Sequence, residues 1–315
     1  MAGLGASGIT ADTLARRAEL LAGLRGVMAQ RGFLEADGAL LSPAAPAERA
    51  LDCLHVETAG YLVPSPEHGL KRLLAESRRS LYQLGHVFRA GEVGRWHNPE
   101  FTMLEWYEIT ARMPAAIDTL AAVLAAAGAP AVVRRRSYQA VFDAVLGIDA
   151  LEAPISVLVA CAHDHGVAPA SSGDGQDRVF WLDLLMGLVV QPELGRDGPE
   201  IVTHFPADDA VLIALDPADA RLGQRFECFW QGIELANGAT ELTDADTARA
   251  RMQREQAARA AQGSAQPPID ERLLATMDDG LPACAGVALG VDRLLALLLG
   301  AKSLAEVVPF AWPSR

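Results

Sequence analysis

An arginine followed by a polar loop and an alternating strand is the first pattern in this sequence that could do chemistry. Arg89 ends a strand-forming run, a glycine-containing loop with His97 and Asn98 follows, and the chain returns as a strand near Phe101. An arginine at a strand end can bind phosphate through paired hydrogen bonds, and a neighbouring ring can stack on a purine. The segment 88–107 therefore indicates a nucleotide site. The alternative is a surface hairpin with ordinary charges, which leaves its density of His, Asn, Glu and aromatic residues unexplained.

Two carboxylates form the second pattern. Glu234 and Glu241 are seven positions apart and flank an Asn237-Gly238 pair that we expect to form a turn. Such a pair can hold Mg²⁺ against the phosphates of a nucleotide. The alternative is an ordinary hairpin, because Asn-Gly turns flanked by acidic residues are common.

A buried strand punctuated by glycines forms the third pattern, in segment 286–295. Glycines such as Gly290 let a ligand approach the backbone closely, and Arg293 follows in the first turn of the predicted helix. We expect this arginine to point at the ligand. The alternative is plain packing of a strand on a helix with a solvent-exposed arginine.

Hydrophobic periodicity places these patterns on regular elements. Helices are expected at 13–31, 67–76, 114–127, 244–261 and 291–299. Strands are expected at 33–41, 56–64, 80–88, 101–109, 201–204, 210–215, 226–232, 234–242 and 286–290. Segment 134–200 is predicted to be a helical insertion with a loop at 171–175. Helices around many strands in this order predict an α+β fold with a largely antiparallel sheet.

Composition narrows the class of protein. The 315 residues are 50% hydrophobic, enough for one large domain or two smaller ones. The chain shows neither a secretory signal nor a transmembrane run, so no membrane association is expected. Its four cysteines, Cys53, Cys161, Cys228 and Cys284, are scattered, which favours reduced thiols in a cytoplasmic protein. A formal net charge of −13 argues against broad binding of nucleic acid.

Taken in order, the three patterns resemble the motifs of class II aminoacyl-tRNA synthetases of the lysyl type. FR followed by HNPEFTMLEWY resembles motif 2, GVALGVDRLL resembles motif 3, and segment 20–43 is compatible with motif 1. Ser65-Pro66-Glu67 resembles the amino-acid loop, and GIELANGATELTDA resembles the metal-binding segment. The resemblance implies a flexible N-terminus at 1–12 and a class II catalytic domain at 13–315. It also implies a homodimer built through motif 1.

Within this branch the sequence resembles the truncated paralogues that attach a lysine to elongation factor P. Motif 1 begins almost at the start of the chain, so we expect no OB-fold domain and no anticodon recognition. Ala288 stands where the tRNA-charging enzymes have glycine, which should reshape the amino-acid pocket. The resemblance implies (R)-β-lysine, or lysine, as substrate and elongation factor P as acceptor. It implies ATP and Mg²⁺ as cofactors.

The same resemblance assigns roles to single residues. Arg89 and Arg293 are implied as the catalytic residues, and Glu234 and Glu241 as the metal ligands. The implied ATP-binding residues are Arg89, Ala90, Gly91, Glu92, His97, Asn98, Phe101, Glu234, Leu235, Gly290 and Arg293. The implied substrate-binding residues are Ser65, Pro66, Glu67, Tyr107, Asn237, Glu241 and Ala288. Phe101 would stack on adenine with Arg293 on the other face, and Glu67 and Tyr107 would receive the side-chain ammonium.

One position departs from the motif. Gly91 stands where the family has a glutamate that helps to hold ATP, and Glu92 follows it. Either Glu92 replaces that glutamate or the backbone at Ala90 and Gly91 makes the contact. Two other functions stay open: an adenylate-forming enzyme acting on tRNA or a small amine, and a non-catalytic regulatory paralogue. The presence of Arg89, Arg293, Glu234 and Glu241 argues against the second.

Overall fold

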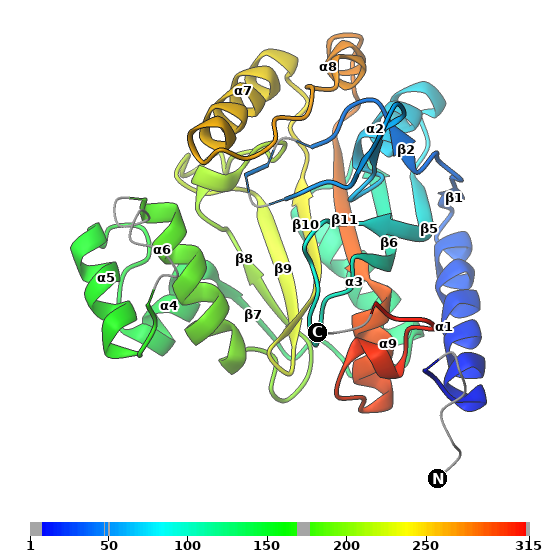
Figure 1. Ribbon diagram of the computed structural model, residues 1–315, viewed down its shortest axis with the longest axis horizontal. Coiled ribbons are helices and arrows are strands. Elements are labelled where there is room, and N and C mark those ends of the chain that lie inside the picture. The colour runs from blue at the N-terminus through cyan, green and yellow to red at the C-terminus, as the bar shows by residue number, and fades with distance from the viewer. Residues whose placement is uncertain (1–7, 47, 50, 169–176, 313–315) are drawn as a thin grey trace.

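An eight-stranded sheet forms the centre of the molecule (Figure 1). The computed structural model describes residues 8–46, 48–49, 51–168 and 177–312. The strands, in their order across the sheet, are β1 (Leu34–Glu35), β5 (Leu81–Phe88), β6 (Glu100–Ile109), β11 (Cys284–Gly290), β10 (Ile233–Thr240), β9 (Arg225–Trp230), β8 (Glu200–Thr203) and β7 (Arg134–Ser137). The β1–β5 and β7–β8 pairs at the two edges are parallel, and the pairs between them are antiparallel.

Alternation along the central strands gives the sheet two different faces. On β6, Leu104 and Trp106 are buried in the largest hydrophobic core, whereas Met103, Glu105 and Tyr107 line a cavity on the other side. Successive side chains of a strand point to opposite faces, so one face is apolar and the other presents polar side chains to the cavity.

Helices α1 (Ala11–Gln30), α3 (Met113–Ala126) and α9 (Val291–Leu299) pack together with the apolar face. Thr10 caps α1 by accepting a hydrogen bond from the backbone N–H of Thr13. Leu20, Leu24 and Met28 of α1 are buried within the chain, and α1 contacts α3. These buried residues of α1 belong to segment 20–43, through which a homodimer was expected, and they pack within one chain.

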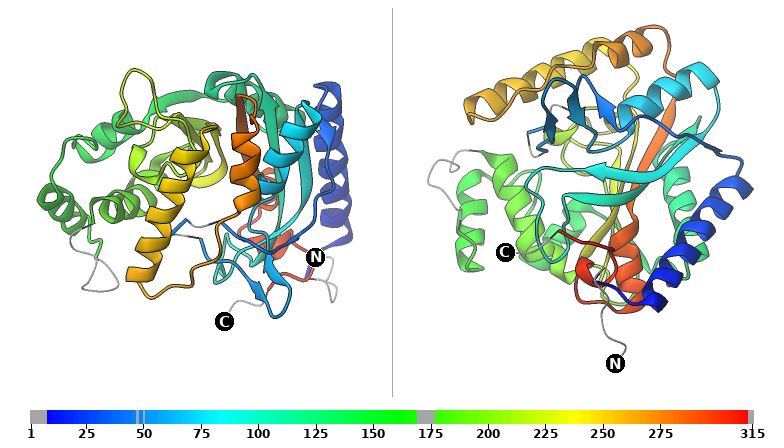
Figure 2. Two further views of the ribbon diagram at one scale, coloured as in Figure 1. Left: turned by 90° about the horizontal axis from the view of Figure 1, so that it is seen from above. Right: turned by 45° about the vertical axis from the view of Figure 1, so that its right-hand side comes forward.

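A second group of elements lies at one end of the sheet. Helices α2 (Glu67–Ser77), α7 (Ala245–Ala261) and α8 (Glu271–Asp278) lie side by side when seen from above (Figure 2). A three-stranded sheet of β2 (Leu41–Ser42), β4 (Gly60–Leu62) and β3 (His55–Val56) accompanies them. These elements border the polar face of the large sheet.

A helical region lies beyond the opposite edge, where β7 and β8 are (Figure 1). It contains α4 (Tyr138–Leu146), α5 (Ile155–Asp164) and α6 (Arg178–Leu185), followed by a π-helical segment (Met186–Val190), and it has its own hydrophobic cluster. The first four residues of the predicted helical insertion 134–200 form strand β7 instead of a helix. The loop expected at 171–175 lies outside the described residues. Short 3-10 helices are found at Gln191–Glu193, Ala207–Asp209 and Leu304–Glu306.

The α+β class with an antiparallel-dominated sheet is confirmed, but several local predictions are wrong. Asn237 and Gly238 lie inside β10, and the hairpin turn is instead at Gln231-Gly232, where both φ angles are positive. No strand is assigned within the described segment 210–215, which makes only isolated bridges at Ile213 and Leu215. Helix α8 was not predicted. None of the described helices is long and apolar enough to cross a membrane.

Candidate active site

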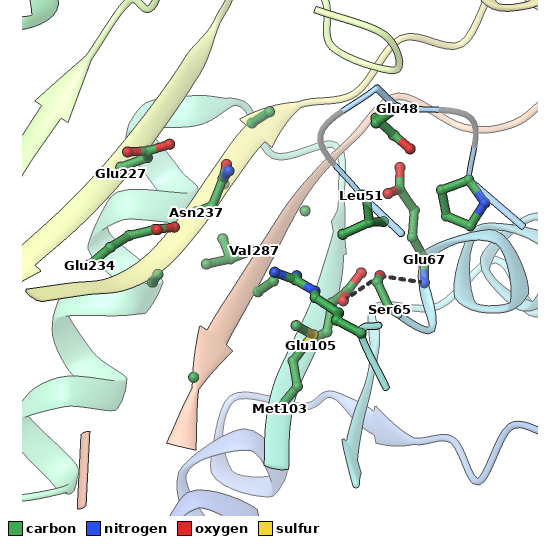
Figure 3. A pocket seen from close by; sticks show the side chains of 18 of the residues that line it. Glu48, Leu51, Ser65, Glu67, Met103, Glu105, Glu227, Glu234, Asn237 and Val287 are labelled. Carbon is green, nitrogen blue, oxygen red and sulfur yellow. Dashed lines mark hydrogen bonds between the residues drawn. The ribbon is translucent and has the colours of Figure 1, made fainter. Parts of the chain in front are cut away.

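A cavity of about 610 Å³ lies on the polar face of the sheet. Its floor is a row of directly paired residues that runs across four strands: Glu105 on β6, Ala288 on β11, Asn237 on β10 and Glu227 on β9. Figure 3 shows Glu105, Asn237 and Glu227 around this space. Pairing of neighbouring strands thus brings together residues that are up to 183 positions apart (288 − 105).

A β-bulge decides which side of β10 Glu234 occupies. The pairing with β9 shifts between Glu234 and Ala236, so Leu235 is one extra residue in the strand. A bulge reverses the alternation of side chains beyond it. Glu234 therefore lies on the same side as Asn237, and both line the cavity.

Arg89 lines the cavity beyond the end of β5. Its contacts are long ones: Nε donates to the carbonyl of Pro64 at 3.4 Å, and Nη1 lies 3.4 Å from Glu92 Oε1. Its guanidinium lies 5.2 Å from the centre of the Phe101 ring. Arg89 thus covers a face of the Phe101 ring, on which adenine was expected to stack. An adenine on that face requires this arginine to move.

Arg293 lies in the first turn of α9, as expected, and reaches the same cavity. It donates to the carbonyls of Trp96 at 3.1 Å and Glu234 at 2.9 Å, and its Nη2 lies 2.8 Å from His97 Nε2. Burial, and next the charge of Arg293, lower the pKa of His97 below its ordinary value. A neutral imidazole there can accept a hydrogen bond from Arg293.

The loop between β5 and β6 is held by backbone and amide contacts. Asn98 donates to the Glu100 carbonyl at 2.5 Å and accepts from the backbone N–H of Trp312 at 2.8 Å. Ala90 donates to the carbonyl of Asp52 at 2.9 Å. Gly91 has φ +75°, a conformation that glycine adopts readily, so the departure from the motif suits the turn. Glu92 lies beside Arg89. Leu235 and Gly290 line the cavity nearby.

The other end of the cavity is acidic and buried. Glu105 is 2% exposed and accepts hydrogen bonds from Ser65 Oγ at 2.7 Å and from the Tyr107 hydroxyl at 2.8 Å. Burial, and next the charge of Glu67, raise the pKa of Glu105 to about 7. Among the described residues Glu105 has hydrogen-bond donors but no ion-pair partner, so a ligand ammonium would complete its environment.

Lys71 forms ion pairs with two further carboxylates, Glu67 and Glu241. This fully buried ammonium lies 2.5 Å from Glu67 Oε1 and 2.6 Å from Glu241 Oε2. Burial opposes its charge, but Glu241 and Glu67 more than offset this and raise the pKa of Lys71 well above its ordinary value. Glu67 begins α2 directly after Ser65 and Pro66. Ser65 and Glu67 line the cavity, and Pro66 is not among its lining residues.

Glu234 and Glu241 line the same cavity but lie at opposite ends of strand β10. Seven residues of extended strand span roughly 23 Å, and Glu241 is paired with Lys71, whereas Glu234 lies near Arg293, with 3.8 Å between Oε2 and Nη1. Among the described residues, no three His, Cys, Asp or Glu side chains form a metal cluster. A Mg²⁺ ion needs only one or two protein carboxylates beside nucleotide phosphates. Glu234 and Glu227, which face the same space, fit that requirement (Figure 3).

From the sequence, no role was assigned to Lys71, Glu105 or Glu227. The signal for Lys71 was its position four residues after Glu67 on one helix face. For Glu105 the signal was its alternation with Met103 and Tyr107. Glu227 carried no usable signal, because its place follows from the pairing of β9 with β10. Burial is the main cause that raises the pKa of Glu227 to about 8, against the opposing charge of Arg225 at 2.6 Å.

The chain belongs to the family described as tRNA synthetases class II (D, K and N), which matches residues 7–313. The order and spacing of the motifs had indicated this family, and the arrangement of the cavity on an antiparallel sheet agrees with it.

Three curated relatives have names more specific than the family description: each is called elongation factor P–(R)-β-lysine ligase. The protein from Klebsiella pneumoniae is 41% identical over 310 residues, which cover 94% of each chain. The one from Pectobacterium atrosepticum is 40% identical over 95% of this chain and 94% of its own. The one from Vibrio vulnificus is 38% identical over 96% of both.

Proposed function

We propose that this protein is an AMP-forming ligase that activates (R)-β-lysine with ATP and transfers it to a lysine side chain of elongation factor P. The observation that carries the proposal is a cavity with two chemically different ends. One end has arginines for phosphate and carboxylate groups, and the other has a buried carboxylate, Glu105, that forms no ion pair with a described residue. The names of the similar proteins supply the particular amino acid and acceptor.

The reaction has two steps. An oxygen of the amino-acid carboxylate attacks the α-phosphorus of ATP, the bond to the β-phosphate oxygen breaks, and pyrophosphate leaves. The neutral ε-amine of the acceptor lysine then attacks the carbonyl of the adenylate, AMP leaves, and the new amide nitrogen loses a proton. No side chain of the enzyme itself acts as a nucleophile, so the enzyme acts through positioning and charge stabilisation.

Arg89 and Arg293 are assigned to the phosphates. Arg89 holds the α-phosphate and the substrate carboxylate, and it exchanges its long contacts with Pro64 and Glu92 for them. Arg293 holds the γ-phosphate and is oriented by two backbone carbonyls. Phe101 offers its ring to adenine once Arg89 leaves it. The remaining loop residues, Ala90, Gly91, Glu92, His97 and Asn98, fix the conformation in which these groups converge.

Glu227 and Glu234 are assigned to Mg²⁺. Their carboxylates are the oxygen ligands that Mg²⁺ prefers, and they lie on the same side of a two-stranded hairpin. Bound there with ATP, the ion supplies neutralisation of the phosphate charge. Glu241 then belongs to the amino-acid end, where with Glu67 and Lys71 it sets the charge around Glu105 and Tyr107.

The test of this assignment is ATP–pyrophosphate exchange with (R)-β-lysine, α-lysine and a neutral amino acid such as leucine. We expect exchange with the two lysine isomers and none with leucine, because leucine has no side-chain ammonium for Glu105. Exchange with leucine at a similar rate, or no exchange with any lysine isomer, would contradict the proposal. The second outcome would favour a non-catalytic regulatory paralogue.

We also propose a homodimer, in which α1 and the segment that follows it form the interface. Leu14, Leu34 and Leu41 are 54%, 41% and 44% exposed, and burying exposed leucines is favourable. Light scattering at micromolar concentration should give twice the mass of one chain, and a monomer would contradict the proposal.

A further inference from the structure

The carboxylates around the cavity can be sorted by whether a cation already faces them. Glu67 and Glu241 share Lys71, Glu227 has Arg225, and Glu234 lies near Arg293. Glu92, Glu255 and Asp292 are paired with arginines, and Asp183 also has a partner. Two lining carboxylates remain without an ion pair among the described residues: Glu105 on the floor, and Glu48 in the connection between β2 and β3. A lysine isomer carries two ammonium groups, which matches this number.

Glu48 points into the cavity from above. Its carboxylate faces that of Glu67 (Figure 3), and its Oε2 atom is buried and accepts no hydrogen bond from any described residue. A buried carboxylate oxygen without a donor is costly. The Oε1 atom of Glu67 is bound to Lys71, so an ammonium placed between the two carboxylates would satisfy Glu48 and remove their mutual repulsion.

The backbone around Glu48 is anchored to helix α7. Arg259 of α7 is 2% exposed and donates to the carbonyls of Glu48 and Leu51, both at 3.0 Å. Its Nη2 also lies 2.7 Å from Asp52 Oδ1. The neighbouring Arg49 bonds Glu255 of the same helix through Nε at 3.0 Å and Nη2 at 2.9 Å. These anchors fix the direction in which Glu48 points.

We infer that Glu48 binds the amine of the substrate that lies nearer its carboxyl group and thereby makes the site prefer a diamino acid; this rests on the function proposed above. Glu105 takes the distal ammonium, because it lies four residues along β6 from Phe101, over which Arg89 lies. Arg89 is assigned to the substrate carboxylate, so Glu105 is at the far end. The connection that carries Glu48 contacts the loop of Arg89 through the Ala90 N–H and the Asp52 carbonyl. On this ground Glu48 is assigned to the amine nearer the carboxyl group.

The test compares Glu48→Gln with wild type in ATP–pyrophosphate exchange, using α-lysine, (R)-β-lysine and 6-aminohexanoic acid, which lacks the proximal amine. Glu57→Gln is the matched control, because Glu57 is exposed in the turn between β3 and β4 and does not line the cavity. We expect KM for both lysine isomers to rise about 10- to 100-fold in Glu48→Gln. KM for 6-aminohexanoic acid and for ATP should stay within twofold of wild type, with an unchanged melting temperature.

Two results would overturn the inference. An equal rise in KM for 6-aminohexanoic acid and the lysines would mean that Glu48 only supports the fold of the cavity. Unchanged KM for all three would mean that Glu48 does not touch the substrate. Failure of the proposed function is distinguishable, because wild type would then show no exchange with either lysine isomer.

Discussion

The two ends of the cavity are built in opposite ways. At the phosphate end, Arg89 and Arg293 are half-buried and bonded mainly to backbone carbonyls. At the amine end, Lys71 and Glu105 are almost fully buried and engaged in hydrogen bonds of 2.5–2.8 Å. Neutral carbonyl partners can be exchanged for phosphate at little cost, whereas buried ion pairs cannot be broken cheaply. The phosphate end is therefore adaptable, and the amine end is fixed before the substrate arrives.

The largest effect is expected at the phosphate end. Arg89→Ala and Arg293→Ala should each reduce exchange by on the order of 10²–10³-fold, because each removes a charge contact made in the transition state. Circular dichroism should show an unchanged fold, since neither arginine belongs to a hydrophobic core. Arg135→Ala, an exposed residue paired with Asp118, is the control. Near-normal exchange in either variant would remove that residue from the mechanism.

The next effect concerns the shape of the floor. Ala288 lies between Glu105 and Asn237 in the row across the sheet, and the tRNA-charging enzymes that the motif resembles have glycine there. Ala288→Gly should raise the ratio of kcat/KM for α-lysine over (R)-β-lysine by roughly 10- to 200-fold, as expected for one methyl group against a bound ligand. ATP use should persist. An unchanged ratio would show that the floor does not select between the isomers.

The smallest expected effect is on the Mg²⁺ requirement, which should change in variants of the phosphate end and not in variants of the amine end. Glu227→Gln and Glu234→Gln should raise the Mg²⁺ concentration for half-maximal activity by at least about tenfold. Glu241→Gln should leave that concentration unchanged and raise KM for the amino acid, because Glu241 faces Lys71. If Glu241→Gln instead raised the Mg²⁺ requirement, the pairing of Glu234 with Glu241 suggested by the sequence would be correct after all.

The phosphate end could be predicted from sequence much better than the amine end. Arg89, His97, Asn98 and Phe101 are close in sequence, so one local pattern reveals them. The same holds for the strand-to-helix junction that carries Arg293, where the predicted helix 291–299 matches α9.

The amine end is assembled from distant segments, and its contacts depend on packing. Lys71 meets Glu241 across 170 positions (241 − 71), and no local pattern indicates this. The bulge at Leu235 changes the side on which Glu234 lies, which strict alternation would get wrong. Gly286 shows the same dependence: a Cβ there would lie 2.4 Å from both Tyr107 and Glu241, so this glycine permits a contact between elements.

The most direct test of the account is the identity of the acceptor. The enzyme is incubated with ATP, Mg²⁺ and (R)-β-lysine, in parallel with purified elongation factor P and with total tRNA, and the products are examined by mass spectrometry. We predict that elongation factor P gains the mass of one lysyl residue on a lysine side chain and that tRNA gains nothing. Amino acid attached to tRNA, with elongation factor P unmodified, would contradict the account and identify the protein as a tRNA ligase.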